Sequence, residues 1–246
     1  MVRRVLPLLA LALFIVAPAE AQKRRAVRSG PPVVAPPSGA CHTFGLVRPG
    51  LKATYHATGS GEADFTITYI SDAPTLTVTT QKVTTAQGVT DVQTRIDGEI
   101  VGNLRGLKHI NVKASTVVSG FGTIVTETDI DFVPSLVMGP AAGWCVGNTW
   151  TTPAVTETIV NKTPAGQNQQ IVTTIASTGE VLAVNESVTV PGGTFNTVKY
   201  RGAAVSGTSV QSVITWVSMQ HNVVVKQDTI DGAGNVTSTL HLTAVQ

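Results

Sequence analysis

Three carboxylates stand at alternate positions in a segment that has the pattern of a β-strand. Glu127, Asp129 and Asp131 lie at i, i+2 and i+4, so on a strand their side chains point to one face. Such a ladder could contribute to a site for a hard cation such as Ca²⁺, which takes six to eight oxygen ligands. The sequence shows no second ligand cluster, and a solvated face that discourages edge pairing explains the same residues. We therefore expect no metal and no cofactor.

Recognisable catalytic motifs are missing from the sequence. The five histidines, at positions 42, 56, 109, 221 and 241, are scattered and form no His-x-x-x-His pair. There is no Gly-x-Ser-x-Gly elbow, no Ser-x-x-Lys and no glycine-rich phosphate loop before a helix. Charged residues make up only 13% of the chain, which leaves few groups from which to build an active site. We predict a protein that is not an enzyme, and a hydrolase assembled from distant strands stays open as the less favoured alternative.

A small set of large aromatic residues provides the candidates for ligand binding. Tyr55, Trp150, Tyr200 and Trp216 are rare residue types in this chain and could line a cavity in a curved sheet. The same four side chains could instead fill the core. The cavity alternative predicts an apolar or lipid-like ligand, and the core alternative predicts a structural or protein-interaction module.

The elements that must position these residues are β-strands. Val and Thr supply 71 of the 246 residues, and both are β-branched types that favour a pleated surface over a helix. Runs of alternating apolar and polar residues lie between glycine turn signals, which is typical of antiparallel hairpins. Thr178-Gly179 and Asp97-Gly98 are among these signals, and residues 134–142 could form one helical turn. We predict an all-β fold, a curved antiparallel sheet that forms an open or half barrel, with a β-sandwich as the alternative.

The N-terminus predicts an exported protein. Arg3 and Arg4 precede the apolar run Val5–Pro18, and small residues at Ala19 and Ala21 suit a signal peptidase. We assign residues 1–21 to a signal peptide, 22–40 to a proline-rich flexible linker and 41–246 to a single antiparallel β domain. The apolar run is too short to span a bilayer, so no transmembrane anchor is expected after cleavage. The predicted location is the periplasm or the extracellular space.

Removal of the signal also changes the charge of the chain. From residue 29 onward there are 11 Lys and Arg against 14 Asp and Glu, so the folded part is slightly acidic. A basic surface for nucleic acid is therefore not supported.

Two cysteines, Cys41 and Cys145, are the complete set in the sequence. In an exported protein such a pair is expected to form a disulfide. The bond would join the start of the β domain to its middle.

Several segments resemble one bacterial family. Val188-Thr-Val-Pro-Gly-Gly-Thr-Phe195 is similar to a Val-Pro-Ala-Gly-Thr-Phe signature, and Arg48–Tyr55, Trp144–Trp150 and Trp216 with His221–Gln227 fit the same pattern. The family consists of exported β-rich domains of unknown function, similar in pattern to lipoprotein-carrier-like open barrels. Gly192 stands where the family has Ala, and Ser218-Met219 and Asn222-Val223 also depart from it. The resemblance implies a curved sheet with a concave face and implies no activity.

The function expected from the sequence is therefore that of an exported cell-envelope β domain. Its partner would be an apolar small molecule on the concave sheet or, in the alternative, an envelope protein. Ligand identity and oligomeric state stay open.

Overall fold

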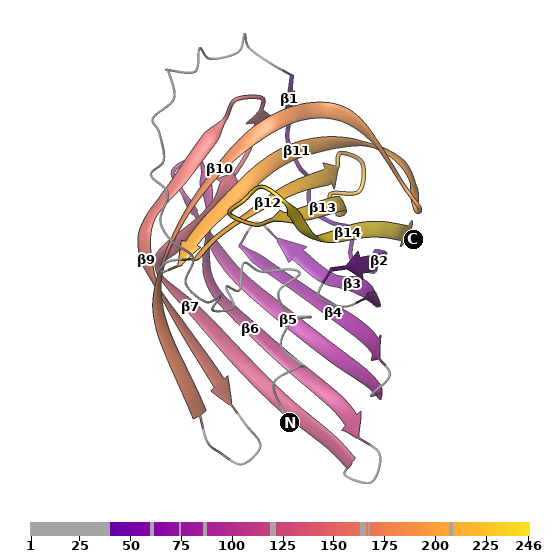
Figure 1. The fold of residues 1–246 in the computed structure, drawn as a ribbon, viewed down its shortest axis with the longest axis vertical. Helices are drawn as coiled ribbons and strands as arrows, with labels where there is room; N and C mark the ends of the chain where they lie inside the picture. Colours follow the sequence, from indigo (N-terminus) through magenta and orange to yellow (C-terminus); the bar gives the residue numbers. More distant parts are fainter. Residues whose placement is uncertain are drawn as a thin grey trace.

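Strands build the whole of the fold that the structure describes (Figure 1). The computed structural model describes residues 40–246 except 60–61, 74, 86–87, 119–121, 163–165, 167 and 207–208. The predicted signal peptide, and all of the predicted linker but residue 40, lie outside the described residues. Within those described ranges, no helix is long and apolar enough to cross a membrane.

Long strands join into one closed antiparallel barrel in the described part of the chain. Its strands are β2 (Lys52–Thr58), β3 (Ala63–Ala73), β4 (Leu76–Thr85), β5 (Gly88–Val101), β6 (Leu104–Val118), β7 (Gly122–Pro140), β9 (Thr149–Lys162), β10 (Asn168–Val190), β11 (Gly193–Ser206), β12 (Ser209–Ser218), β13 (Val224–Ile230) and β14 (Val236–Val245). A separate ribbon pairs β1 (Cys41–His42) with β8 (Trp144–Cys145). Neighbours in the barrel follow one another along the chain, apart from two pairs, β7 with β9 and β14 with β2.

The predicted curved antiparallel sheet is confirmed, and the sheet curves far enough to close. Closure comes from β14 and β2, which pair through Leu242 with Tyr55 and His241 with His56. Figure 1 shows the β10–β11 hairpin arching over one end of the barrel, while the β6–β7 and β9–β10 hairpins extend at the other.

The alternation of residue types along each strand separates an inner from an outer face. Ile110, Ile130, Ile175 and Leu242 point inward and are at most 1% exposed. The buried residues fall into three clusters, of which the first joins β2–β4 with β13 and β14, and the second joins β5–β7 with β9–β11. The third lies where β9, β10 and β11 approach the β1–β8 ribbon. Thr, Ser, Lys and acidic side chains are common at the outward positions, for example Thr54, Thr66, Lys82, Asp91 and Ser115, which lie in register across β2–β6.

Two predicted turns are wrong because each glycine makes room for a neighbour within a strand. Thr178-Gly179 lies inside β10, where a Cβ on Gly179 would lie 2.1 Å from the indole of Trp150. Asp97-Gly98 lies inside β5, where a Cβ on Gly98 would lie 2.9 Å from the carbonyl oxygen of Gly106. Glycine in a strand interior commonly marks such a close approach.

The predicted helical turn at residues 134–142 is also wrong, because β7 continues to Pro140. Proline lacks an N–H for the strand ladder and is tolerated at bulges. Pro134 lies opposite the irregularity between Leu107 and His109 of β6, so β7 continues past it.

Candidate functional site

The inner face of the barrel is open to solvent at one end. On β7, the inward residues go from Ile130, 1% exposed, through Thr128 and Thr126 to Ile124, 41% exposed. On β10, the inward Ile175 is 1% exposed, whereas the inward Ile171 is 52% exposed. Since side chains two positions apart share a face, these isoleucines line the inside of the barrel and are nevertheless accessible.

We call this accessible inner surface the inner mouth. It is formed by the ends of β6, β7, β9, β10 and β11 that lie beyond the second core cluster. Its residues are Thr116, Ile124, Thr126, Thr128, Ile159, Asn161, Ile171, Thr173 and Ser206, with Glu157 on its floor.

Hydroxyl and amide groups of the inner mouth bond to one another across neighbouring strands. The Thr128 hydroxyl donates to Oδ1 of Asn161 at 2.9 Å, and the hydroxyls of Thr173 and Ser206 lie 3.1 Å apart. These polar groups therefore have partners, and the isoleucines between them offer apolar area. Such a surface suits an amphiphilic molecule better than a strongly charged one.

Glu157 is the exceptional residue of the inner mouth. It is 6% exposed and lies between Phe132 of β7 and Thr173 of β10 in the strand register. Among the residues that the structure describes, its carboxyl has no hydrogen-bond or ion-pair partner. Burial raises the pKa of the Glu157 carboxyl above its ordinary value, because desolvation penalises the charged form.

Aromatic side chains fill the opposite end of the barrel. Trp144 lies 5.6 Å from Trp150 and 5.2 Å from Tyr200 between ring centroids, and Phe44 contacts Trp144 at 5.4 Å. Trp150 is 6% exposed and packs in the third core cluster with Val181 and Val198. This aromatic plug lies at the end of the barrel opposite the inner mouth.

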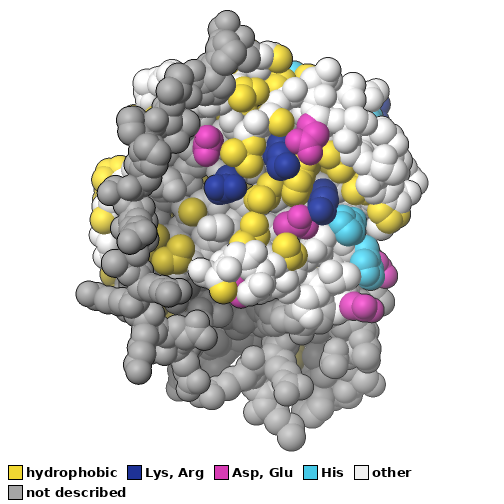
Figure 2. Space-filling model, turned by 45° about the horizontal axis from the view of Figure 1, so that its top comes forward, with side chains coloured by type: hydrophobic (Ala, Val, Ile, Leu, Met, Phe, Trp, Pro, Cys, Tyr) yellow, Lys and Arg dark blue, Asp and Glu magenta, His cyan; other side chains and the backbone are white. Residues whose placement is uncertain are grey.

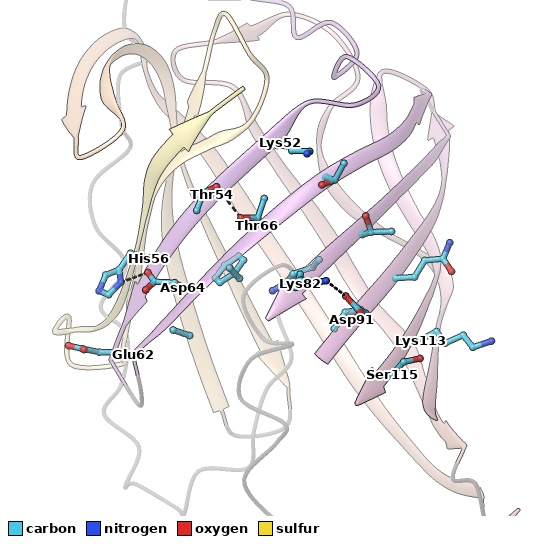
Figure 3. Close-up of a pocket in the computed structure, with 17 residues that line it drawn as sticks. Lys52, Thr54, His56, Glu62, Asp64, Thr66, Lys82, Asp91, Lys113 and Ser115 are labelled. Carbon is cyan, nitrogen blue, oxygen red and sulfur yellow. Dashed lines mark hydrogen bonds and ion pairs between the residues drawn. The ribbon is translucent and has the colours of Figure 1, made fainter. Parts of the chain in front are cut away.

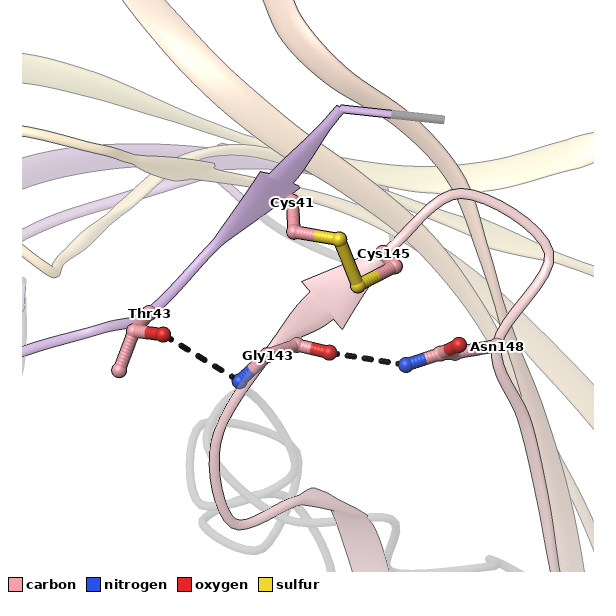
Figure 4. The surroundings of a disulfide bond; sticks show 5 residues. All are labelled: Cys41, Thr43, Gly143, Cys145 and Asn148. Atoms are coloured by element: carbon pink, nitrogen blue, oxygen red, sulfur yellow. Dashed lines mark hydrogen bonds between the residues drawn. A yellow bond between two sulfur atoms is a disulfide. The ribbon is translucent and has the colours of Figure 1, made fainter. Parts of the chain in front are cut away.

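The predicted disulfide between Cys41 and Cys145 is present and holds the segment that carries the plug (Figure 4). It joins β1 to β8 next to Trp144. Gly143 strengthens the same junction, because its N–H donates to the Thr43 hydroxyl at 3.3 Å and its carbonyl accepts from Nδ2 of Asn148 at 2.8 Å.

The four aromatic residues proposed from the sequence lie in three separate environments. Tyr55 is stacked on Phe65 at 5.5 Å in the first core cluster, and Trp150 and Tyr200 belong to the aromatic plug. Trp216 points outward. The structure therefore does not bring the four together.

Trp216 is covered by charged side chains on the outer face. The ammonium groups of Lys199 and Lys226 lie 4.9 and 4.7 Å from its ring centroid, and its Nε1 donates to Oε1 of Glu186 at 3.2 Å. Lys226 also pairs with Asp228 at 2.8 Å. Cation–π contacts and ion pairs thus bury an indole on the outside of the barrel. Figure 2 shows one face of the molecule on which charged, histidine and hydrophobic side chains lie close together.

The carboxylate ladder lies on the outer face and is bound by basic and amide groups. Nζ of Lys162 lies 3.0 Å from Oε1 of Glu127 and 2.6 Å from Oδ2 of Asp129, and Asp131 bonds to Nδ1 of His109 at 2.8 Å. Burial acts to raise the pKa of Asp129, but bonds from Lys162 and Asn111 outweigh it and lower that pKa. Within the described ranges, no group of three His, Cys, Asp or Glu residues is arranged to hold a metal ion.

The described histidines show no catalytic arrangement with a nucleophile. The side chains of His56 and His109 hydrogen-bond to carboxylates, Asp64 and Asp131, both at 2.8 Å. A hydrolase would require one of them to contact a hydroxyl or thiol as well. The described hydrogen bonds contain no such contact.

A shallow trough of about 1240 Å³ crosses the outer face of β2–β6 (Figure 3). The strand register arranges its side chains in two parallel rows, Thr54–Thr66–Lys82–Asp91–Ser115 and Lys52–Thr68–Thr80–Gln93–Lys113. Lys82 pairs with Asp91 at 3.6 Å, and the hydroxyls of Thr54 and Thr66 lie 3.0 Å apart. Most residues that line the trough are polar, and none of the four aromatic candidates is among them.

Sequence reasoning missed Glu157, although a signal for it existed. Val155, Glu157 and Ile159 alternate along one face of a strand, so the sequence places an acid among inward apolar residues. The trough had no comparable signal, because its rows come from five strands whose register the sequence does not specify.

Comparison with known proteins leaves the function open. No family model matches the chain, and no curated protein matches it. A Bacteroides fragilis protein described as exported, with a YmcC-like fold, is 10% identical over 84% of this chain and all of its own, with a TM-score of 0.44. A Parabacteroides distasonis protein described as a lipoprotein is 12% identical over the same shares, with a TM-score of 0.36. Similarities at this level carry no argument about function, and the signature resemblance around Val188–Phe195 stays a prediction.

Proposed function

We propose that the protein is an exported, non-enzymatic envelope protein that binds an amphiphilic ligand in the inner mouth of its barrel. The observation that carries this proposal is the exposure of Ile124 and Ile171 on the inner face. Apolar side chains inside a barrel are normally buried, so accessible ones offer a binding surface. Hydroxyl and amide groups between them favour a ligand that also carries polar atoms.

Export is supported by two independent features. The N-terminal pattern of Arg3 and Arg4, an apolar run and small residues at Ala19 and Ala21 fits a secretion signal. The disulfide between Cys41 and Cys145 fits an oxidising compartment such as the periplasm or the extracellular space.

The binding proposal is tested with diphenylhexatriene, a hydrocarbon whose fluorescence rises in apolar sites. We expect saturable binding to the wild-type protein. The double variant Ile124→Asp with Ile171→Asp should bind at least tenfold more weakly, because charge is costly on an apolar contact surface. A matched control is available in the adjacent outward residues Val125 and Val172, which are 39% and 60% exposed.

The control variant Val125→Asp with Val172→Asp should bind the probe like wild type. Equal losses in the inward and outward variants would contradict a site on the inner face, and so would wild-type protein that fails to bind the probe. Native mass spectrometry of protein from its own host should also detect a co-purified amphiphile.

The outer trough supports a second candidate function, docking of an envelope protein. Its two rows of polar residues span five strands, which is a width of about 19 Å at roughly 4.8 Å per strand. Lys52 and Lys113 stand at the ends of one row without an ion-pair partner among the described residues. The double variant Lys52→Glu with Lys113→Glu should lose the cross-links that the wild-type protein forms with an envelope protein in intact cells. Unchanged cross-linking would argue against this candidate.

A further inference from the structure

Glu157 has a structural demand that the described chain does not meet. Buried polar groups in folded proteins are nearly always hydrogen-bonded, because an unpaired one forfeits its bonds to water. Yet Glu157 is 94% buried as a residue, and its carboxyl has no hydrogen-bond or ion-pair partner among the described residues, so the solvent that reaches its oxygens from the inner mouth is what bonds to them. The nearest hydroxyl in the register belongs to Thr173, and it is bonded to Ser206 at 3.1 Å.

The surroundings of Glu157 also exclude a compensating charge from the inner face. The inward residues beside it on β6, β7, β9, β10 and β11 carry no ionisable group; they are Val112, Ala114, Thr128, Ile130, Phe132, Val155, Ile159, Ile171, Thr173, Ile175, Ala204 and Ser206. The charged residues of the same strands, such as Asp131 and Lys162, point outward and are paired there. Burial in such surroundings raises the pKa of the Glu157 carboxyl, which extends the pH range in which its neutral, protonated form is present.

We propose that Glu157 anchors the ligand by donating a hydrogen bond from its neutral carboxyl to an uncharged oxygen in the ligand's head group. This inference rests on the proposed function of the inner mouth. The acceptor would be an ester or amide carbonyl or an alcohol. An anionic head group is disfavoured, because among the described inward residues no cation faces it to compensate its charge.

The positions of these residues also set the orientation in which the ligand would bind. Glu157 lies on the floor next to the packed core, and Ile159, Ile171 and Ile124 follow toward the rim. Phe132, the register partner of Glu157, is eight residues from Ile124 along β7, about 27 Å at roughly 3.4 Å per residue. The ligand would enter head first and lay one long apolar chain along β7.

The inference is tested with a monoacylglycerol, which carries an uncharged ester head, and with the fatty acid of the same chain length. Each displaces diphenylhexatriene from the protein. At neutral pH we expect the wild-type protein to bind the monoacylglycerol at least tenfold more tightly than the fatty acid anion.

Two variants isolate the role of the carboxyl. Glu157→Leu removes the donor and should weaken monoacylglycerol binding about tenfold while leaving diphenylhexatriene binding unchanged, since a buried hydrogen bond is worth roughly that factor. Glu157→Gln keeps an uncharged donor and should bind within about twofold of wild type. Far-UV circular dichroism and thermal melting establish that both variants are folded, and Glu157→Gln carries the test if Glu157→Leu is not.

The pH dependence of monoacylglycerol binding distinguishes an anchoring role of Glu157 from a purely structural one. Wild-type affinity for the monoacylglycerol should fall as the pH rises through the raised pKa of Glu157, and that of Glu157→Gln should stay flat. Identical pH profiles, or Glu157→Leu binding like wild type, would overturn the role of Glu157 and leave the proposed function standing. Failure of the wild-type protein to bind diphenylhexatriene at all would instead overturn the proposed function.

Discussion

The contact between Gly179 and Trp150 provides a sharp test of the aromatic plug. A methyl group at position 179 would lie 2.1 Å from both Cε2 and Cζ2 of the indole and 2.7 Å from its Nε1. Ordinary contacts are near 3.5–4 Å, so the ring would have to move by more than about 1 Å. Trp150 is 6% exposed and packs against Trp144 and Tyr200, which leaves it no free direction.

These contacts set the magnitude expected for Gly179→Ala. Overpacking a close-packed core costs about 1–3 kcal/mol, and complete loss of a buried Trp costs about 3–5 kcal/mol. We expect the free energy of unfolding to fall by about 3 kcal/mol, at the boundary of these two ranges. The melting temperature should fall by about 6–12 °C, since 1 kcal/mol corresponds to roughly 2–4 °C at this chain length.

The assay is equilibrium unfolding in urea followed by tryptophan fluorescence and by circular dichroism. Gly232→Ala is the matched control, because a Cβ on Gly232 meets nothing within 4 Å. The control should change stability by less than about 0.5 kcal/mol, the range for surface substitutions. A Trp150→Ala background removes the ring, so Gly179→Ala should cost almost nothing there.

Two results would refute this reasoning. One is a cost for Gly179→Ala no larger than that of Gly232→Ala. The other is an equal cost with and without Trp150, because it would place the effect in the strand backbone and not in the ring contact.

Three further predictions concern the disulfide and two groups of ionisable residues. Replacing Cys41 and Cys145 by Ser should lower the free energy of unfolding by up to about 4–5 kcal/mol, the chain-entropy value for a loop of roughly 100 residues; unchanged urea midpoints would contradict it. Glu157→Gln should stabilise the protein at pH 7–8 but not near pH 4. The pKa of Glu157 is raised in the folded state, so the free energy of unfolding of the wild-type protein falls as the pH rises from 4.5 through the folded-state pKa. Parallel stability–pH curves for the two proteins would disprove this. Lys162→Met should raise the pKa of Glu127, which Lys162 lowers by a direct hydrogen bond, and carboxyl NMR titration should detect the change; an unaltered titration curve would show that the bond is not formed in solution.

The local features of the fold follow from the sequence, because they depend on neighbours along the chain. Alternation such as Phe65, Ile67 and Tyr69 on one side of a strand predicts a half-buried sheet, and β3 has this pattern. The pairing of Cys41 with Cys145 also follows, since an exported chain with one pair of cysteines has one choice.

The features that depend on distant contacts could not be predicted. In the sequence, Thr178-Gly179 has the pattern of a turn. That Gly179 makes room for the indole of Trp150 depends on the pairing of β9 with β10. Trp216 reads as a core or cavity residue by type, but strand register places it outside between Lys199 and Lys226. Glu157 could be placed on an apolar face from its neighbours, whereas its lack of a partner depends on five strands.

Closure of the barrel between β2 and β14 has a consequence for the order of folding. The Thr243 hydroxyl donates to the carbonyl of Thr54, a contact between residues 189 positions apart. Pairings this distant in sequence form slowly, because the entropy cost of closing so long a loop is met before the contact stabilises the chain. Until they form, β2 and β14 each present an unpaired strand edge, which is a template for association with other chains. Self-association during refolding should therefore compete with closure of the barrel. A peptide with the sequence of β14 should inhibit refolding, because it would pair with the free edge of β2.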